Sequence, residues 1–153
     1  MRETGIGPRL RAATLIAYFD TSALIKLIFT EQESDLAEEL WDRAELVASS
    51  QLIYPEARAA AAMAHRTGRI DARTLRNAVQ AIDDLCAEIR VIGIDYTLAH
   101  LAGELAERHG LRGYDAVHLA SVISIDDPGL LTATWDGELA AATFACGYAV
   151  APA

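Results

Sequence analysis

The sequence predicts a three-layer α/β/α domain with a central parallel sheet of four to five strands. Two patterns support this prediction. Short apolar runs of strand-forming residues alternate with segments whose apolar residues recur at helical spacing. Strands that alternate with helices form parallel sheets covered on both faces. The chain has 153 residues, 52% of them hydrophobic, which is enough to bury the core of one such domain.

Five apolar runs are predicted to be the strands. The first joins aliphatic and aromatic residues without a charge and ends at Phe19. A turn sequence, Asp126-Asp127-Pro128-Gly129, precedes the fourth. We expect the strands over residues 15–19, 46–48, 89–94, 130–134 and 148–150.

Seven segments between and beside these runs are predicted to be helices. Asp71 and Asp95 each precede a helical pattern and are expected to be N-caps, while Gly68 is expected to end a helix. Ser49 and Ser50 offer an N-cap for the third helix. We expect the helices to start near residue 21, to span 33–43 and 52–66, to follow residue 71, to span 97–109 and 114–123, and to start at residue 136.

The start of the chain differs from the rest. Residues 1–14 contain Gly5, Gly7 and Pro8 and show no periodicity. We interpret residues 1–14 as a flexible N-terminal arm or a start-site extension, and residues 15–153 as a single domain.

Charge and cysteine content narrow the class of protein. The formal net charge of −9 argues against a surface that coats nucleic acid, but a nucleic-acid enzyme with local basic clusters stays possible. Cys86 and Cys146 lack metal-ligand spacing, and we interpret them as reduced thiols of a cytoplasmic protein. No membrane segment is expected, because Asp20 and Lys26 interrupt the apolar stretch over residues 12–29.

Four acidic residues stand out by position. Asp20 follows the first strand and Asp136 follows the fourth, and the carboxyl ends of parallel strands border the ligand crevice of open α/β sheets. Glu56 and Asp115 each share a helix face with apolar residues. Both are therefore predicted to point inward, where an acid rarely lies without a partner.

Simpler explanations exist for each acid. Helix capping alone accounts for the two acids that follow strands. An internal salt bridge with Lys26, Arg58 or Arg112 would satisfy the inward acids. Helical phase places Arg58 on a different face from Glu56, which weakens that pairing.

A converging set of four acids would need a cation. Two carboxylates about 4 Å apart repel each other by ~4 kcal/mol at an effective dielectric constant of 20. Without protons or a cation, four could not stay ionised together. Oxygen ligands without His or Cys favour Mg²⁺ or Mn²⁺ over zinc. The hydroxyls of Ser22 and Thr134 lie beside the acids in the sequence and could support them.

The same residues resemble a known family. The segments that carry the resemblance are Phe19-Asp20-Thr21-Ser22-Ala23-Leu24, Glu56 in a mid-chain helix, Gly113-Tyr114-Asp115-Ala116 and Thr134-Trp135-Asp136. They look like the PIN-domain ribonucleases, and most of all like the VapC toxins of VapBC toxin–antitoxin pairs. The resemblance covers residues 15–150, so that residues 15–153 would be a single PIN-like nuclease domain. Residues 1–14 depart from the family, whose members usually start close to the first strand.

The resemblance implies a function and partners. Asp20, Glu56, Asp115 and Asp136 would be the catalytic acids that hold one or two Mg²⁺ or Mn²⁺ ions, with Thr134 as the hydroxyl that often precedes the fourth acid. Members cleave structured RNA, commonly tRNA or ribosomal RNA, are inhibited by a VapB-type antitoxin, and commonly form homodimers. The sequence hypothesis is therefore a metal-dependent endoribonuclease toxin.

Two alternatives stay open at this point. One is a catalytically silent PIN-like module that binds RNA or protein. The other is a Mg²⁺-dependent aspartyl phosphotransfer domain, which usually places a lysine near its last strands. Lys26 is the single lysine of this chain and lies far from them in the sequence.

Basic residues and one histidine complete the candidates. Arg58, Arg66, Arg69 and Arg73, with Arg76 nearby, could bind RNA phosphates or form a solvated surface. His118 lies one helical turn after Asp115 and could face the acids. A single histidine beside apolar residues is more often structural, so we do not place His118 in the site.

Overall fold

The structure, a computed structural model, describes residues 14–153. The predicted arm over residues 1–14 lies outside the described residues except for Thr14. In chain order, the elements are β1 (Ile16–Phe19), α1 (Thr21–Ile28), α2 (Ser34–Arg43), β2 (Leu46–Ser50), α3 (Ile53–Arg66), α4 (Ala72–Glu88), β3 (Arg90–Ile92), α5 (Tyr96–His109), α6 (Gly113–Ile125), β4 (Leu131–Ala133), α7 (Gly137–Ala145) and β5 (Ala149–Ala151).

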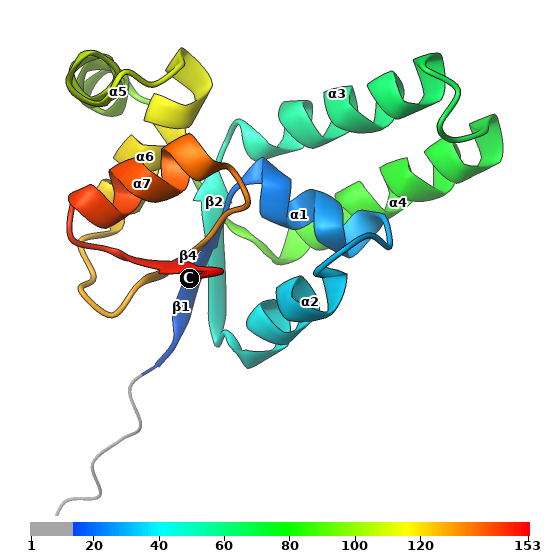
Figure 1. Ribbon diagram of the computed structural model, residues 1–153, viewed down its shortest axis with the longest axis horizontal. Coiled ribbons are helices and arrows are strands. Elements are labelled where there is room, and N and C mark those ends of the chain that lie inside the picture. Colours follow the sequence, from blue (N-terminus) through cyan, green and yellow to red (C-terminus); the bar gives the residue numbers. More distant parts are fainter. Residues whose placement is uncertain (1–13) are drawn as a thin grey trace, which may run out of the picture.

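The five strands form one sheet in the order β3-β2-β1-β4-β5 (Figure 1). Every neighbouring pair is parallel. Phe19 of β1 lies opposite Ala133 of β4, while Tyr18 lies opposite Ala48 of β2. The chain moves outward from β1 in one direction through β2 and β3, and in the other through β4 and β5. The strand order therefore reverses beside β1, and this is where such sheets bind ligands.

Helices cover both faces of the sheet, which confirms the predicted three layers. Ala17 and Phe19 of β1 are buried in a cluster with residues of α1, α2, α3 and α4. Tyr18 points to the opposite face, where it packs with Val122 of α6. A further cluster joins α5, α6 and α7 around Leu119. The alternation along β1 follows from the two-residue period of a strand.

Several predicted helix ends have the expected geometry. The side chains of Asp71 and Asp95 accept hydrogen bonds from the backbone N–H groups of Thr74 and Leu98, as N-caps do. Gly110 ends α5 in the left-handed conformation, at φ 64°.

The predicted capping role of Ser49 and Ser50 is wrong. Both belong to β2, are fully buried, and pair with Val91 and Ile92 of β3. Pairing with a third strand extends β2 beyond what its own residues indicate. The Ser50 Oγ accepts a hydrogen bond from the Leu52 N–H at 3.1 Å, but the N-cap position of α3 is Leu52 itself.

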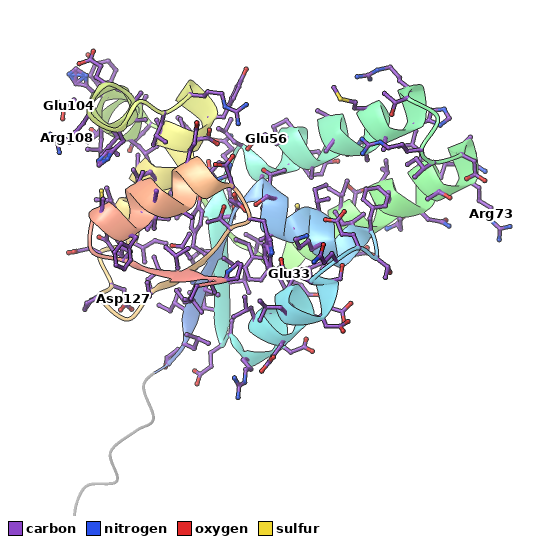
Figure 2. All side chains as sticks on the ribbon, in the orientation of Figure 1. Glu33, Glu56, Arg73, Glu104, Arg108 and Asp127 are labelled. Atoms are coloured by element: carbon purple, nitrogen blue, oxygen red, sulfur yellow. The ribbon has the colours of Figure 1, made fainter. Side chains whose placement is uncertain are left out.

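Helices α3 and α4 form a hairpin that projects from the rest of the molecule (Figure 1). Gly68, at φ 73°, lies in the turn between them. Arg73 lies near the tip of the hairpin, while Glu56 lies at its base beside the sheet (Figure 2). The hairpin thus separates the predicted basic residues near its tip from the acid that α3 contributes.

None of the helices that the structure describes in residues 14–153 is long and apolar enough to span a membrane.

The base of the hairpin depends on Ile82, which is completely buried against the α1–α4 core. We expect Ile82→Ala to lower the free energy of unfolding by about 2–5 kcal/mol, because it leaves a cavity in a packed interior. Asn77→Ala, at an exposed position of the same helix, should change it by less than about 0.5 kcal/mol. Urea denaturation of both variants measures the difference, and equal effects would contradict this packing.

Candidate functional site

The candidate site begins at the carboxyl ends of β1 and β4. Asp20 follows β1 directly, and its backbone N–H donates to the Ala133 carbonyl of β4 at 3.2 Å. Asp136 follows β4 after two further residues and is the N-cap of α7. The two acids that follow strands in the sequence therefore lie at the same edge of the sheet, linked through Thr134, where the strand order reverses and a ligand crevice is predicted.

Asp20 is 3% exposed, and three donors surround its carboxylate. Oδ1 accepts hydrogen bonds from the Ser22 Oγ at 2.7 Å and from the Ala23 N–H at 2.9 Å. Oδ2 accepts one from the Thr134 Oγ1 at 2.5 Å. Asp20 is therefore the N-cap of α1 as well as a candidate site residue.

The environment of Asp20 acts on its pKa in two directions. Burial raises the pKa above its usual value because the charged form is desolvated. The hydrogen bond from Thr134, the charge of His118 and the hydrogen bond from Ser22 oppose this rise without cancelling it. A buried carboxylate of this kind gains from a nearby cation, which would favour its ionised form.

The two predicted hydroxyls connect this acid to the segment after β4. Ser22 Oγ accepts a hydrogen bond from the Trp135 N–H at 2.8 Å. Thr134 Oγ1 accepts one from the Asp136 N–H at 3.1 Å. Each hydroxyl thus donates to Asp20 and accepts from the backbone that leads into α7, so both orient two acids at once.

Glu56 reaches the site from α3 and has a different set of partners. Its Oε1 accepts hydrogen bonds from the Thr21 Oγ1 at 3.0 Å and from the His118 Nε2 at 2.6 Å. Burial alone would raise the pKa of Glu56, but the hydrogen bond and charge of His118, with the Thr21 hydroxyl, lower it below its ordinary value. Glu56 is therefore ionised at neutral pH. Its partner is neither Arg58 nor Lys26.

Asp115 and Asp136 are joined by an arginine. The Arg112 Nε lies 3.2 Å from the Asp115 Oδ2, and the Nη2 of the same guanidinium group lies 3.6 Å from the Asp136 Oδ2. Arg112 is 70% exposed, so this contact is open to solvent and contributes little stability. One of the predicted salt-bridge partners thus contacts two of the four acids and offsets one of their two charges.

The donor set suits a hard divalent ion. All four acids present oxygen, which Mg²⁺ and Mn²⁺ prefer. Within residues 14–153, no three His, Cys, Asp or Glu side chains are grouped closely enough to hold a metal ion together. Mg²⁺ keeps several waters and is usually held by one or two carboxylates, so an open acidic site fits it. The exposed Arg112 lies between Asp115 and Asp136, so its side chain would have to move outward before an ion could bind to both acids.

The predicted RNA-binding arginines are exposed but are not part of the acidic cluster. Arg58 donates to the Tyr54 hydroxyl at 2.7 Å and lies over its ring. Arg66 and Arg69 lie at the end of α3 and in the turn that follows, and Arg73 lies near the hairpin tip (Figure 2). The four arginines therefore lie along the α3–α4 hairpin, with Arg58 near Glu56 at its base and the other three toward its tip.

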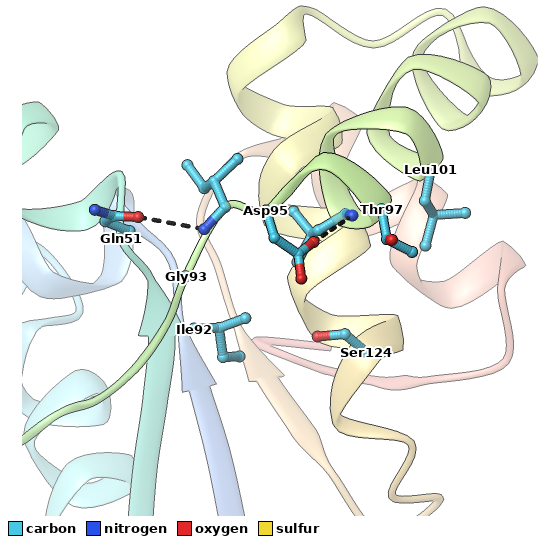
Figure 3. Close-up of a pocket in the computed structure, with 9 residues that line it drawn as sticks. Gln51, Ile92, Gly93, Asp95, Thr97, Leu101 and Ser124 are labelled. Atoms are coloured by element: carbon cyan, nitrogen blue, oxygen red, sulfur yellow. Dashed lines mark hydrogen bonds between the residues drawn. The ribbon is translucent and has the colours of Figure 1, made fainter.

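Two hollows border the sheet, and the acids take part in only one of them. A hollow of about 420 Å³ is lined by Glu56, Thr21 and Tyr114. Another, of about 730 Å³, lies beyond β3 and is largely apolar (Figure 3). Its polar side chains are used locally, since Gln51 accepts from the Ile94 N–H and Asp95 caps α5. Of the four candidate acids, Glu56 lines the first hollow and none lines the second.

Three residues at the site were missed or undervalued in the sequence. His118 and Thr21 both donate to Glu56, and Arg112 bridges two acids. The signal for His118 was its spacing of one helical turn after Asp115. Nothing in the local sequence indicated that Thr21 would face α3, because threonine is also an ordinary residue in the first turn of a helix.

Comparison with known proteins identifies the family of this chain. The sequence model of the PIN domain matches residues 17–143. The chain belongs to the PIN-domain family. Ribonucleases VapC45 and VapC49 from two strains of Mycobacterium tuberculosis are each 45% identical to this PIN domain over 138 residues, which cover 90% of this chain and 96% of the relative.

Solved structures share the fold of this PIN domain. PAE2754 from Pyrobaculum aerophilum is 26% identical, with a TM-score of 0.64 over 89% of this chain and 90% of that one. A chain of a toxin–antitoxin complex from Klebsiella pneumoniae is 23% identical, with a TM-score of 0.62 over 82% and 90%.

The support of Asp20 by Thr134 can be measured as stability. We expect Thr134→Val to lower the free energy of unfolding of the metal-free PIN domain by about 1.5–3 kcal/mol at neutral pH, because a buried charge loses a donor. The loss should shrink as the pH falls. Thr134 lowers the pKa of Asp20, so its contribution is full while Asp20 is ionised and fades once Asp20 is protonated.

Thr132→Val is the matched control for this measurement. Thr132 lies on β4 and is fully buried, and its hydroxyl has no hydrogen-bond partner among residues 14–153. Replacing it should leave the free energy of unfolding unchanged or raise it. Urea denaturation at neutral and acidic pH compares the two variants. Equal losses that are independent of pH would contradict the role given to Thr134.

Proposed function

We propose that this protein is a metal-dependent endoribonuclease toxin of the VapC type that hydrolyses phosphodiester bonds in structured RNA. The supporting observation is that Thr134 links Asp20 to Asp136 at the sheet edge, Arg112 contacts both Asp136 and Asp115, and His118 of α6 bonds to Glu56 of α3. This arrangement occurs in a chain 45% identical to proteins named ribonucleases. An acidic site alone would not favour RNA over another phosphate ester as the substrate. The choice of RNA is supported by the relatives, which are named ribonucleases.

The chain would supply the geometry of hydrolysis. Asp20, Glu56, Asp115 and Asp136 would hold Mg²⁺ or Mn²⁺ against the scissile phosphate. A bound ion of this kind lowers the pKa of a water and neutralises charge on the leaving oxygen. The carboxylates would orient that water in line with the bond that breaks, so that its oxygen joins phosphorus as the leaving oxygen departs. Ser22 and Thr134 would keep Asp20 in place throughout.

In this proposal, the substrate and the partners are those that the resemblance to the VapC toxins implies. The substrate would be tRNA or ribosomal RNA, and Arg58, Arg66, Arg69 and Arg73 would contact its phosphates along the hairpin. A VapB-type antitoxin would inhibit the enzyme, which would act as a homodimer in the cytoplasm. Exposed cations on a strongly acidic chain support the hairpin as an RNA surface, because a local basic patch can oppose a negative whole.

RNA cleavage by purified variants tests the site. We expect Asp115→Asn to lower the rate of cleavage by more than about 100-fold, because losing even an outer partner of a metal ligand costs about 10–100-fold. Asp35→Asn, an exposed change in α2, should leave the rate unchanged. An Asp115→Asn protein that is folded and fully active would refute the assignment.

The same assay separates the alternative functions. A silent binding module would retain RNA in EDTA and never cleave it after Mg²⁺ is added. An aspartyl phosphotransfer domain would take up phosphate covalently on Asp20. Lys26 does not favour that chemistry, because its ammonium group contacts the Glu31 carboxylate and the Gln32 carbonyl and lies over the Trp135 ring.

Metal binding should appear as thermal stabilisation. With Mn²⁺ at about 100 times its dissociation constant, we expect the free energy of unfolding to rise by about 2.7 kcal/mol. For a chain of this length that corresponds to a rise in Tm of about 5–10 °C. Asp20→Asn should remove most of this rise and Asp35→Asn should keep it. Differential scanning calorimetry with Mn²⁺ and with EDTA measures both, and an equal rise in all three proteins would count against the site.

A further inference from the structure

A buried chain of hydrogen bonds connects the sheet to Glu56. The Ser50 backbone N–H contacts the Tyr18 hydroxyl oxygen at 3.1 Å, and this oxygen lies 2.8 Å from the His118 Nδ1. The His118 Nε2 lies 2.6 Å from the Glu56 Oε1. Tyr18 is fully buried and His118 is 2% exposed. The chain thus runs from β2 through β1 and α6 to α3.

The proton positions along this chain follow from its two ends. A backbone N–H can only donate, so the Tyr18 oxygen accepts from Ser50 and its own hydrogen is available to the His118 Nδ1. The ionised carboxylate of Glu56 can only accept, so the Nε2 of His118 must carry a hydrogen. A neutral imidazole protonated at Nε2 places one hydrogen in every contact of the chain and holds Glu56 through the Nε2 hydrogen bond; the charge that further lowers the pKa of Glu56 belongs to the protonated form of His118.

This arrangement leaves the two oxygens of Glu56 unequal. Both of its donors, Thr21 and His118, bind Oε1. No side chain or backbone group among residues 14–153 donates to Oε2, and the Glu56 side chain is 27% exposed beside the open hollow. One oxygen is therefore held by the protein, while the other is left without a donor on a partly exposed side chain that lines the hollow.

His118 also links two of the acids. It lies one helical turn after Asp115 on α6, while its Nε2 bonds to Glu56 on α3. This bond joins two helices that are far apart in the sequence. A shift of the imidazole would therefore change the distance between Glu56 and Asp115, whereas the capping contacts of Asp20 would be unaffected.

We propose that His118, oriented by Tyr18, is a positioning residue that holds the Oε1 of Glu56 and thereby directs its Oε2 to the metal and water of the active site. The proposal rests on the proposed function for the identity of that metal and water. It differs from a purely structural role, in which the Tyr18–His118 pair would only join α6 to the sheet.

Two substitutions of His118 separate these roles. His118→Gln keeps an N–H donor near the position of Nε2, while His118→Asn keeps a polar group near Nδ1 and loses the donor to Glu56. We expect His118→Asn to lower kcat for RNA cleavage and the affinity for Mn²⁺ by about 10–100-fold each, with the KM for RNA little changed. His118→Gln should retain both within a few-fold. Calorimetric titration with Mn²⁺ gives the affinity without requiring activity.

A measurement on the metal-free protein tests the chain directly. Long-range ¹H–¹⁵N spectra report which imidazole nitrogen carries the hydrogen, and we expect Nε2 for His118. Tyr18→Phe removes the donor to Nδ1, so it should change the tautomer signature and weaken Mn²⁺ binding. Tyr148→Phe, at a half-buried tyrosine that packs against the same core cluster as Tyr18 but takes no part in the hydrogen-bond chain, should change neither.

The possible outcomes distinguish failure of the positioning role of His118 from failure of the proposed ribonuclease function. A hydrogen on Nδ1 in the wild-type protein, or an unchanged Mn²⁺ affinity in both His118→Asn and Tyr18→Phe, would overturn the positioning role. Equal losses in His118→Gln and His118→Asn would also overturn it, because only one of them lacks the donor. The expected tautomer and Mn²⁺ affinities without any RNA cleavage would keep the positioning role and refute the ribonuclease.

Discussion

The carboxyl group of Asp20 is buried, and its need for hydrogen bonds constrains the structure around it. Its donors come from two places far apart in the sequence, the first turn of α1 and Thr134 after β4. Thr134 reaches it only because Phe19 lies opposite Ala133 in the parallel register. A slip of one residue between β1 and β4 would turn Thr134 to the other face of the sheet and leave the charge without that donor.

The other acids are balanced by separate means, which explains how an acidic site persists in a stable fold. Glu56 is held by His118, and Arg112 lies between Asp115 and Asp136. Repulsion between neighbouring carboxylates is thereby offset without a buried lysine or arginine. The exposed position of Arg112 matters, since an exposed ion pair is weak enough to give way to a divalent ion.

Local signals predicted the elements best where they act within one helix or strand. Asp71 and Asp95 were recognised as N-caps because a cap bonds to a backbone group three residues away. The prediction for Ser49 and Ser50 failed because the end of β2 is set by pairing with β3, some 40 residues later. Strand ends depend on a partner that no local pattern identifies.

The sequence by itself determined the three-layer class, the position of four acids on their elements, and the resemblance to PIN-domain ribonucleases. The fold class and the positions of the acids follow from periodicity and spacing, which are properties of single segments, while the resemblance rests on short motifs around the acids. Only the tertiary structure decided which groups face those acids. Helical phase predicts that Glu56 points inward, but it cannot predict that a histidine 62 residues later will form a hydrogen bond with it. That pairing depends on how α3 and α6 approach each other, and their approach is fixed by the packed core and the sheet register.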